Sequence, residues 1–176
     1  LDLGGLASLK RIGVNAFYEC NITSLSLDGC ASLESIERQA FIYNEIASLN
    51  LNQCTSLIKI GNEAFRSNLI ENLQIEGCTN LITINSRAFA DNLINSLNLS
   101  ACTALRSIGF YAFSDNNISD IDISNCGQLT FINTRAFSNN NISGIILPAC
   151  LGYESYGWKD QNDNSFSVES YVTDLS

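Results

Sequence analysis

The sequence has 176 residues, of which 45% are hydrophobic, a share that is typical of a folded globular domain, whereas the charged share of 15% is low. Nine Lys and Arg residues against 18 Asp and Glu residues give a formal net charge of −9, which argues against binding to nucleic acid or to an anionic membrane surface. Apolar runs extend over only a few residues, so the sequence predicts no transmembrane helix.

Two markers show that the chain is an internal repeat with a period of 24 residues. Cysteines follow one another at this step, at Cys30, Cys54, Cys78, Cys102, Cys126 and Cys150. The dipeptide Ala-Phe recurs at the same step, with its phenylalanines at Phe17, Phe41, Phe65, Phe89, Phe113 and Phe137. Because periods of about 20–29 residues are typical of leucine-rich repeats, we predict a solenoid over residues 1–152 with six to seven repeats.

Each repeat opens with a predicted strand. Two slots, two residues apart, hold Leu or Ile in every copy, from Leu1 and Leu3 to Ile145 and Leu147. This alternation predicts a short strand with one buried face. Copies that stack about 4.7–4.9 Å apart would bury these slots in a continuous core, so we predict a β-rich, right-handed solenoid with a parallel sheet on its concave face.

The segment that follows each strand, "LESIERQAF" and its copies, lacks the three-turn apolar stripe of a helix. It therefore predicts turns, short strands or 3₁₀ pieces, and little α-helix. The phenylalanine of each Ala-Phe dipeptide is predicted to point inward. Because aromatic side chains bury large areas, we expect the six rings to form a stacked column in the core.

The cysteines could belong to a disulfide framework, to a metal site or to the core. A disulfide framework has irregular spacing and an even number of cysteines, whereas this chain has seven cysteines, six of them at a fixed step. Zinc sites use pairs about two to four residues apart, and the closest pair, Cys20 and Cys30, is ten residues apart. We therefore predict seven free, buried thiols that act as small apolar side chains, and no metal site.

A second inward column follows the Ala-Phe dipeptide. It holds Cys20 in the first copy and asparagine in the later ones, at Asn44, Asn68, Asn92, Asn116 and Asn140. An inward amide can satisfy backbone groups at a turn that has no sheet partner, so this column predicts an asparagine ladder.

The repeat ends after about residue 150, and residues 153–176 are predicted to form a C-terminal cap or the start of a small β domain. The segments "YGWKD" and "SFSVESYV" flank the turn-rich "QNDN", which is typical of a β-hairpin. This segment carries Lys159 against five acidic residues, so its net charge is 1 − 5 = −4.

The frame L-x-L-x-x-C-x-x-L-x-x-I-x-x-x-A-F, with the A-F-x-x-C of "IGVNAFYEC", resembles the BspA-like (Treponema-type) leucine-rich repeats over residues 1–150. The G-Y-x-x-x-G-W that begins at residue 152 resembles the start of a Listeria–Bacteroides-type small β repeat. The first resemblance implies a bacterial cell-surface or secreted protein with a role in recognition and adhesion. The chain departs from that family's commonest repeat, which is slightly shorter and often has Pro where Asp28-Gly29 stands here.

Candidate ligand-binding residues lie on the exposed side of the predicted strands, which we call the strand face. They are Ser26, Asn50, Gln74, Asn98 and Asp122, with Asp28, Glu76 and Asp120 beside them. These side chains are small, polar and mildly acidic, and they include none of the aromatic or Arg anchors that interfaces favour. The carboxylates stand on different coils, so they do not indicate a cage for calcium.

No catalytic residue and no cofactor is predicted, because the chain has no His and no nucleophile or phosphate-binding motif in a suitable context. We expect a monomeric recognition or adhesion module whose partner is a surface protein or glycan of a host or neighbouring cell. The alternative is a passive spacer that displays another domain. Leu1 occupies a strand slot, so we expect a signal peptide and a surface anchor to lie outside this chain.

Overall fold

The computed structural model describes residues 1–148 as a parallel β-solenoid of about six coils, with no helix in this range. Its strands are β1 (Arg11–Ile12), β2 (Ser35–Ile36), β3 (Ser48–Asn50), β4 (Lys59–Ile60), β5 (Asn72–Gln74), β6 (Thr83–Ile84), β7 (Ser96–Asn98), β8 (Ser107–Ile108), β9 (Asp120–Asp122), β10 (Phe131–Ile132) and β11 (Gly144–Ile146). The predicted fold class is confirmed. Cys150 and the predicted C-terminal segment 153–176 lie outside the described residues.

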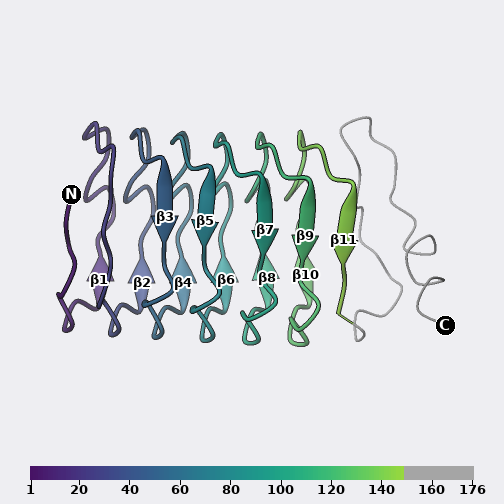
Figure 1. The fold of residues 1–176 in the computed structure, drawn as a ribbon, viewed down its shortest axis with the longest axis horizontal. Coiled ribbons are helices and arrows are strands. Elements are labelled where there is room, and N and C mark those ends of the chain that lie inside the picture. The colour runs from purple at the N-terminus through teal and green to yellow at the C-terminus, as the bar shows by residue number, and fades with distance from the viewer. Residues whose placement is uncertain (149–176) are drawn as a thin grey trace.

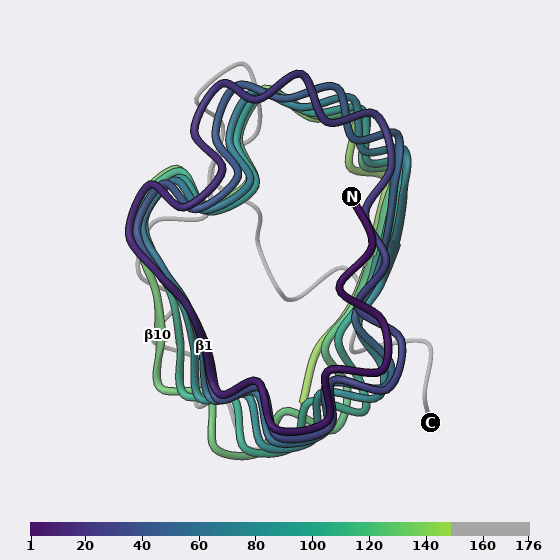
Figure 2. The same ribbon diagram turned by 90° about the vertical axis from the view of Figure 1, so that its left-hand side faces the viewer.

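The coils stack side by side, one repeat per coil (Figure 1). The strands pair in parallel, and each paired residue lies opposite the residue 24 positions away in the sequence. Ser35, for example, lies opposite Lys59, and Leu49 lies opposite Leu73. Viewed from the N-terminal end in Figure 2, the chain runs clockwise as it recedes from the viewer, which is a right-handed coil. The step of the sequence repeat is therefore the length of one turn of the solenoid.

Two rows of strands run along different walls of the coil. The two-residue strands form one continuous sheet in the order β1-β2-β4-β6-β8-β10. The three-residue strands of the strand face form two sheets, β3-β5 and β11-β9-β7, with one isolated bridge between Asp2 and Ser26. Between β5 and β7 the N–H of Ile75 donates to its neighbour, the carboxylate of Glu76, at 3.0 Å.

The core follows the predicted columns. Rings of consecutive phenylalanines lie 5.1–5.6 Å apart between centroids and within 11° of parallel, from Phe17 to Phe137. The middle members of this stack, such as Phe65 and Phe89, are fully buried, whereas Phe17 is only half-buried because no coil covers it on one side. The cysteine column and the Leu and Ile columns surround the stack.

The turns beside the Ala-Phe dipeptide explain why this segment is not helical. Thirteen non-glycine residues have φ between 52° and 59°, and twelve of them form two columns with the repeat period. Gln39 belongs to one of these columns and Tyr43 to the other. The N–H groups of Gln39, Phe41 and Tyr43 donate to carbonyls of the next coil at 2.7–3.0 Å. The left-handed conformation thus points the backbone N–H groups along the solenoid axis. These groups donate to the next coil, so they are not available for the hydrogen bonds within a helix.

Gly77 marks the tightest approach between two coils. Its N–H donates to the side-chain oxygen of Asn52 at 3.0 Å, and a Cβ at this position would overlap the Asn52 carbonyl group. We expect Gly77→Ala to lower the free energy of unfolding by about 2–3 kcal/mol, because backbone must shift to admit the methyl group. Urea unfolding followed by circular dichroism measures this. Gly13→Ala is the matched control, since a Cβ at Gly13 meets no atom within 4 Å; equal losses for the two variants would contradict the close approach.

Candidate recognition surfaces

The predicted ligand-binding residues all lie along the strand face. Asn50, Gln74, Asn98 and Asp122 are the last residues of β3, β5, β7 and β9, and Asp120 is the first residue of β9. Asn50 lies opposite Gln74 in the register, and Asn98 lies opposite Asp122. Ser26 pairs with Asp2 in the first coils, while Asp28 and Glu76 stand in the turns that follow the strands. The structure therefore brings these residues together as a row, coil by coil.

Most of the polar oxygens in this row are engaged by the protein itself. Side-chain oxygens of Asn50, Asn98 and Asp122 each accept the N–H of the residue two positions on, at 2.9–3.0 Å. An oxygen in this geometry closes the turn after the strand in place of a backbone partner. The row thus has a structural task in shaping the turns, which the sequence reasoning did not foresee.

The carboxylates of the strand face do not form a metal-binding group. Within residues 1–148 there is no cluster of three or more His, Cys, Asp or Glu side chains that could hold an ion. Asp120 accepts a hydrogen bond from the Ser119 hydroxyl at 2.6 Å, and Glu76 is half-buried against the backbone of Ile75. These acids serve local contacts on separate coils.

The asparagine column forms a continuous hydrogen-bonded ladder. The amide nitrogen of Asn68 donates to the carbonyls of Phe41, Phe65 and Arg66 at 2.8–3.4 Å, and its oxygen accepts the N–H of Ile46 at 3.1 Å. The same pattern recurs at Asn44, Asn92, Asn116 and Asn140. Each amide therefore joins its own turn to the preceding coil, and the asparagines are at most 6% exposed.

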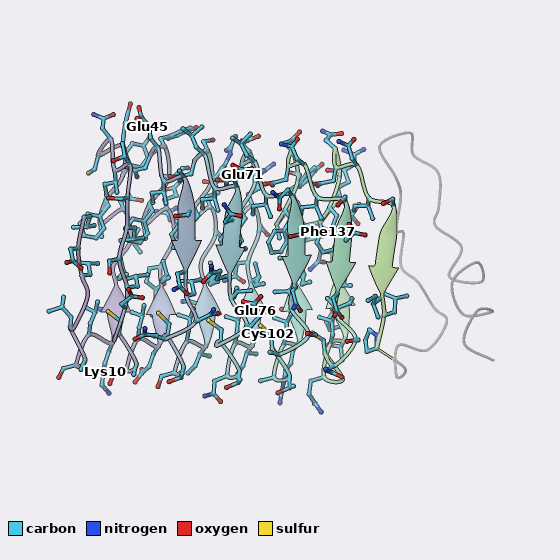
Figure 3. All side chains as sticks on the ribbon, viewed as in Figure 1. Lys10, Glu45, Glu71, Glu76, Cys102 and Phe137 are labelled. Carbon is cyan, nitrogen blue, oxygen red and sulfur yellow. The ribbon has the colours of Figure 1, made fainter. Side chains whose placement is uncertain are left out.

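The cysteine column lies in the core, and its sulfur atoms follow one another from coil to coil (Figure 3). The thiols of Cys30, Cys78 and Cys126 donate to leucine carbonyls of the preceding coil at 3.2–3.3 Å. Burial raises the pKa of Cys54 and of Cys102 to about 12, so neither thiol forms a nucleophilic thiolate at neutral pH. No disulfide joins any two cysteines of the described range.

The prediction that all thiols are buried is wrong for Cys20, which is exposed. Cys20 stands in the asparagine column of the first coil, where no preceding coil covers it. Its thiol donates only to the nearby carbonyl of Tyr18, at 3.4 Å. The burial of a cysteine therefore depends on the column that it occupies and on whether a neighbouring coil covers it.

The reactivity of the thiols should distinguish the exposed Cys20 from the buried cysteines. In a Cys150→Ser background, we expect one thiol of the native protein, Cys20, to react rapidly with Ellman's reagent at pH 8. The other five described cysteines should react only on unfolding, because they are buried as neutral thiols. Cys20→Asn should remove the rapid phase. Rapid reaction of a second thiol in the folded protein would contradict the buried column.

A second surface, which the sequence reasoning missed, lies beyond the strands β6, β8 and β10. The ring of Tyr111 lies between the guanidinium groups of Arg87 and Arg135, at 5.1 Å and 5.9 Å from the ring centroid. Arg135 also donates a hydrogen bond to the Tyr111 hydroxyl at 2.9 Å. The sequence does contain a signal for this surface, namely the change in one column from neutral and acidic residues to Arg and Tyr. From coil to coil, this column reads Asn15, Gln39, Glu63, Arg87, Tyr111 and Arg135.

Several cations of the first three coils form ion pairs, unlike Arg87 and Arg106. Lys59 pairs with Glu37 at 2.9 Å, and Arg66 pairs with Asp91 at 2.9 Å. The hydrogen bond from Lys59 lowers the pKa of Glu37, and the hydrogen bond to Asp91 raises the pKa of Arg66. Neither Arg87 nor Arg106 forms an ion pair with any residue of the range 1–148. The guanidinium groups of Arg87 and Arg106 are therefore available to an external anion.

Comparison with known proteins identifies a family whose model matches this chain. The model of the BspA type leucine rich repeat region, which has six copies, matches residues 6–103 and 34–162. No curated protein and no solved structure gives a significant match. Proteins of this family are generally non-enzymatic repeat scaffolds, associated with the cell surface or with secretion and with protein interaction. With one coil per 24-residue repeat and a family match over most of its length, the chain belongs to the BspA-type leucine-rich repeat family.

Proposed function

We propose that this chain is a non-catalytic recognition module of a secreted or cell-surface protein, which binds a protein or glycan on a host or neighbouring cell through exposed solenoid positions. One observation carries the proposal, namely the contrast between inner and outer columns of the same repeat. The buried columns keep Phe, Asn or Cys in coil after coil, whereas the outer column of Arg87 and Tyr111 changes its residue at every step. A constant interior with a variable exterior is what a scaffold for a binding surface requires.

The family supports the recognition role, and the chemistry of the described residues fits it better than catalysis. The buried cysteines are neutral, and the strand-face carboxylates are engaged in turns and local contacts. No helix among residues 1–148 is long and apolar enough to cross a membrane. The adhesion role and the identity of the partner are parts of the proposal.

A passive spacer is the competing function, and the strand face gives it one argument. The polar oxygens of that face are used within the protein, so the face offers few free acceptors to a ligand. A spacer needs only length and stiffness, which the inter-coil ladders provide.

The decisive experiment combines a screen for binding partners with the replacement of this solenoid by an unrelated one. The protein would be screened against arrays of extracellular-matrix proteins and of glycans, and in parallel exchanged in its parent protein for an unrelated rigid solenoid of similar length. The proposal expects at least one saturable partner, and loss of cell attachment on exchange. Absence of any partner together with full attachment by the exchanged protein would refute recognition and favour the spacer.

A further inference from the structure

Three neighbouring coils share a surface whose composition differs from the rest of the chain. It consists of residues 82–87, 106–111 and 130–135, which read "ITINSR", "RSIGFY" and "TFINTR" and contain three Arg and no carboxylate. We call it the Arg-aromatic face. The matching segments of the first three coils, "KRIGVN", "ESIERQ" and "IKIGNE", mix four cations with three carboxylates. A carboxylate-free basic surface is thus confined to the later coils of a chain whose net charge is −9.

The sheet aligns this surface in register. β6, β8 and β10 pair so that Thr83, Ser107 and Phe131 lie in one row, and Figure 1 shows these strands side by side. Backbone N–H groups of Thr130 and Phe131 donate to the carbonyl of Arg106 at 3.0–3.2 Å, which places Arg106 beside the next coil. Arg87 is likewise held against the following coil, since its N–H donates to the carbonyl of Phe110 at 2.9 Å.

Stacking on Tyr111 orients the Arg87 guanidinium group before any partner arrives. The Tyr111 ring lies against the guanidinium group of Arg87 at 5.1 Å, and cation–π contacts of this kind persist in water. A guanidinium group stacked on an aromatic ring keeps its N–H edge for planar, bidentate contact with a carboxylate. Holding the side chain in place reduces the entropy that binding would otherwise cost.

Two phenylalanines on this face are exposed to water, in columns that hold polar residues in most of the other coils. Phe131 is 65% exposed and Phe110 is 50% exposed. In the adjacent coil toward the N-terminus the same two slots hold Ser107 and Ser86. Aromatic side chains beside Arg are the composition that concentrates binding energy at protein interfaces.

We propose that the Arg-aromatic face binds an acidic polypeptide segment in which carboxylates are interspersed with apolar or aromatic side chains. Arg87 and Arg106 pair with the carboxylates, and the rings of Phe110 and Phe131 cover the apolar side chains. A sulfated glycan would use the guanidinium groups but would leave both phenylalanine rings without apolar contacts, so the polypeptide fits better. The inference rests on the proposed recognition function and names its surface and the chemistry of its partner.

The test uses the whole chain and a defined probe, an immobilised random copolymer of glutamate and tyrosine, in biolayer interferometry. Arg87→Glu with Arg106→Glu should weaken binding at least about tenfold, because it opposes carboxylates with carboxylates. Phe110→Ser with Phe131→Ser should also weaken it. Each substituted residue already occupies the same slot in another coil, at Glu63, Glu34, Ser86 and Ser107, so the fold tolerates it.

The matched control places the same change of charge elsewhere on the same wall. Arg11→Glu with Arg38→Glu alters two cations of the first two coils, in the columns of Phe131 and Phe110, and should leave binding to the copolymer within about twofold. Equal weakening by both charge reversals would overturn the inference, because only net charge would then matter. Absence of copolymer binding would also overturn it, while a partner found in the matrix-protein and glycan screen would still uphold recognition.

Two further probes separate the alternatives. Heparin that binds more tightly than the copolymer, and that is unaffected by the two serine substitutions, would overturn the inference in favour of a glycan. Sedimentation that shows concentration-dependent dimers, abolished by Arg87→Glu with Arg106→Glu, would overturn it in favour of a second copy of the chain. Polyglutamate should bind more weakly than the glutamate–tyrosine copolymer, because it offers no apolar side chains to the phenylalanines; equal binding would contradict the role of the rings.

Discussion

Replacing Asn92 by alanine is expected to lower the free energy of unfolding by about 3–5 kcal/mol, since several buried backbone groups would lose their partners at once. The amide nitrogen of Asn92 donates to the carbonyls of Phe65, Phe89 and Ala90 at 2.9–3.2 Å. Its oxygen accepts the N–H of Ile70 at 3.1 Å. Domains are stable by only about 5–15 kcal/mol, so this change removes a large share of the total.

The measurement is equilibrium unfolding in urea, followed by far-ultraviolet circular dichroism. Asn117→Ala is the matched control, because Asn117 is exposed and its described hydrogen bond to Ile94 comes from its backbone; it should change stability by less than about 0.5 kcal/mol. Asn92→Asp keeps the acceptor and loses the donors, so it should also be strongly destabilising. A small effect of Asn92→Ala would show that the ladder does not hold the coils together.

Replacing Phe89 by alanine is expected to cost about 3–5 kcal/mol, because it opens a cavity in the middle of the aromatic stack. Phe89 is fully buried, and its ring centroid lies 5.4 Å from that of Phe65 and 5.2 Å from that of Phe113. Both faces of the ring therefore lose a stacked neighbour.

The position along the stack provides the control for this prediction. Phe17 is half-buried and stacks on one neighbour only, Phe41, at 5.1 Å. Phe17→Ala should therefore cost less than half as much as Phe89→Ala in the same urea experiment. Equal costs at the two sites would mean that burial within the stack does not determine the contribution of each ring.

The interior of the solenoid could be predicted because each inner column repeats one residue type at a fixed step. The phenylalanine of Phe65 recurs in six coils and the asparagine of Asn68 in five, and repetition converts a weak local pattern into a strong one. The left-handed turns could not be predicted in this way. Their usual signal is glycine or asparagine, whereas these columns hold Glu63, Arg87 and Tyr111, whose conformation is imposed by hydrogen bonds to the next coil.

The candidate surfaces were harder to predict than the core. The alternation of the repeat predicts the strands that carry the strand face, but the hydrogen bond from the N–H of Ser124 to Asp122 depends on a turn geometry that the pattern does not specify. The burial of Cys20 was mispredicted because it depends on whether another coil covers the slot. The Arg-aromatic face was overlooked because Phe110 and Phe131 become neighbours of Arg87 and Arg106 only after the coils are stacked.

The solenoid requires coils of 24 residues that stack in register, and deletion of one coil tests this requirement most directly. Removing residues 59–82 joins Ile58 to Thr83, which occupies the slot of Lys59, so every column stays aligned. Removing residues 59–78 instead, 20 residues, shifts every later column out of register. In urea unfolding followed by circular dichroism, we expect the first variant to keep a β-rich spectrum and a cooperative transition at lower stability, and the second to lose both. Equal loss of structure in the two variants would contradict the solenoid.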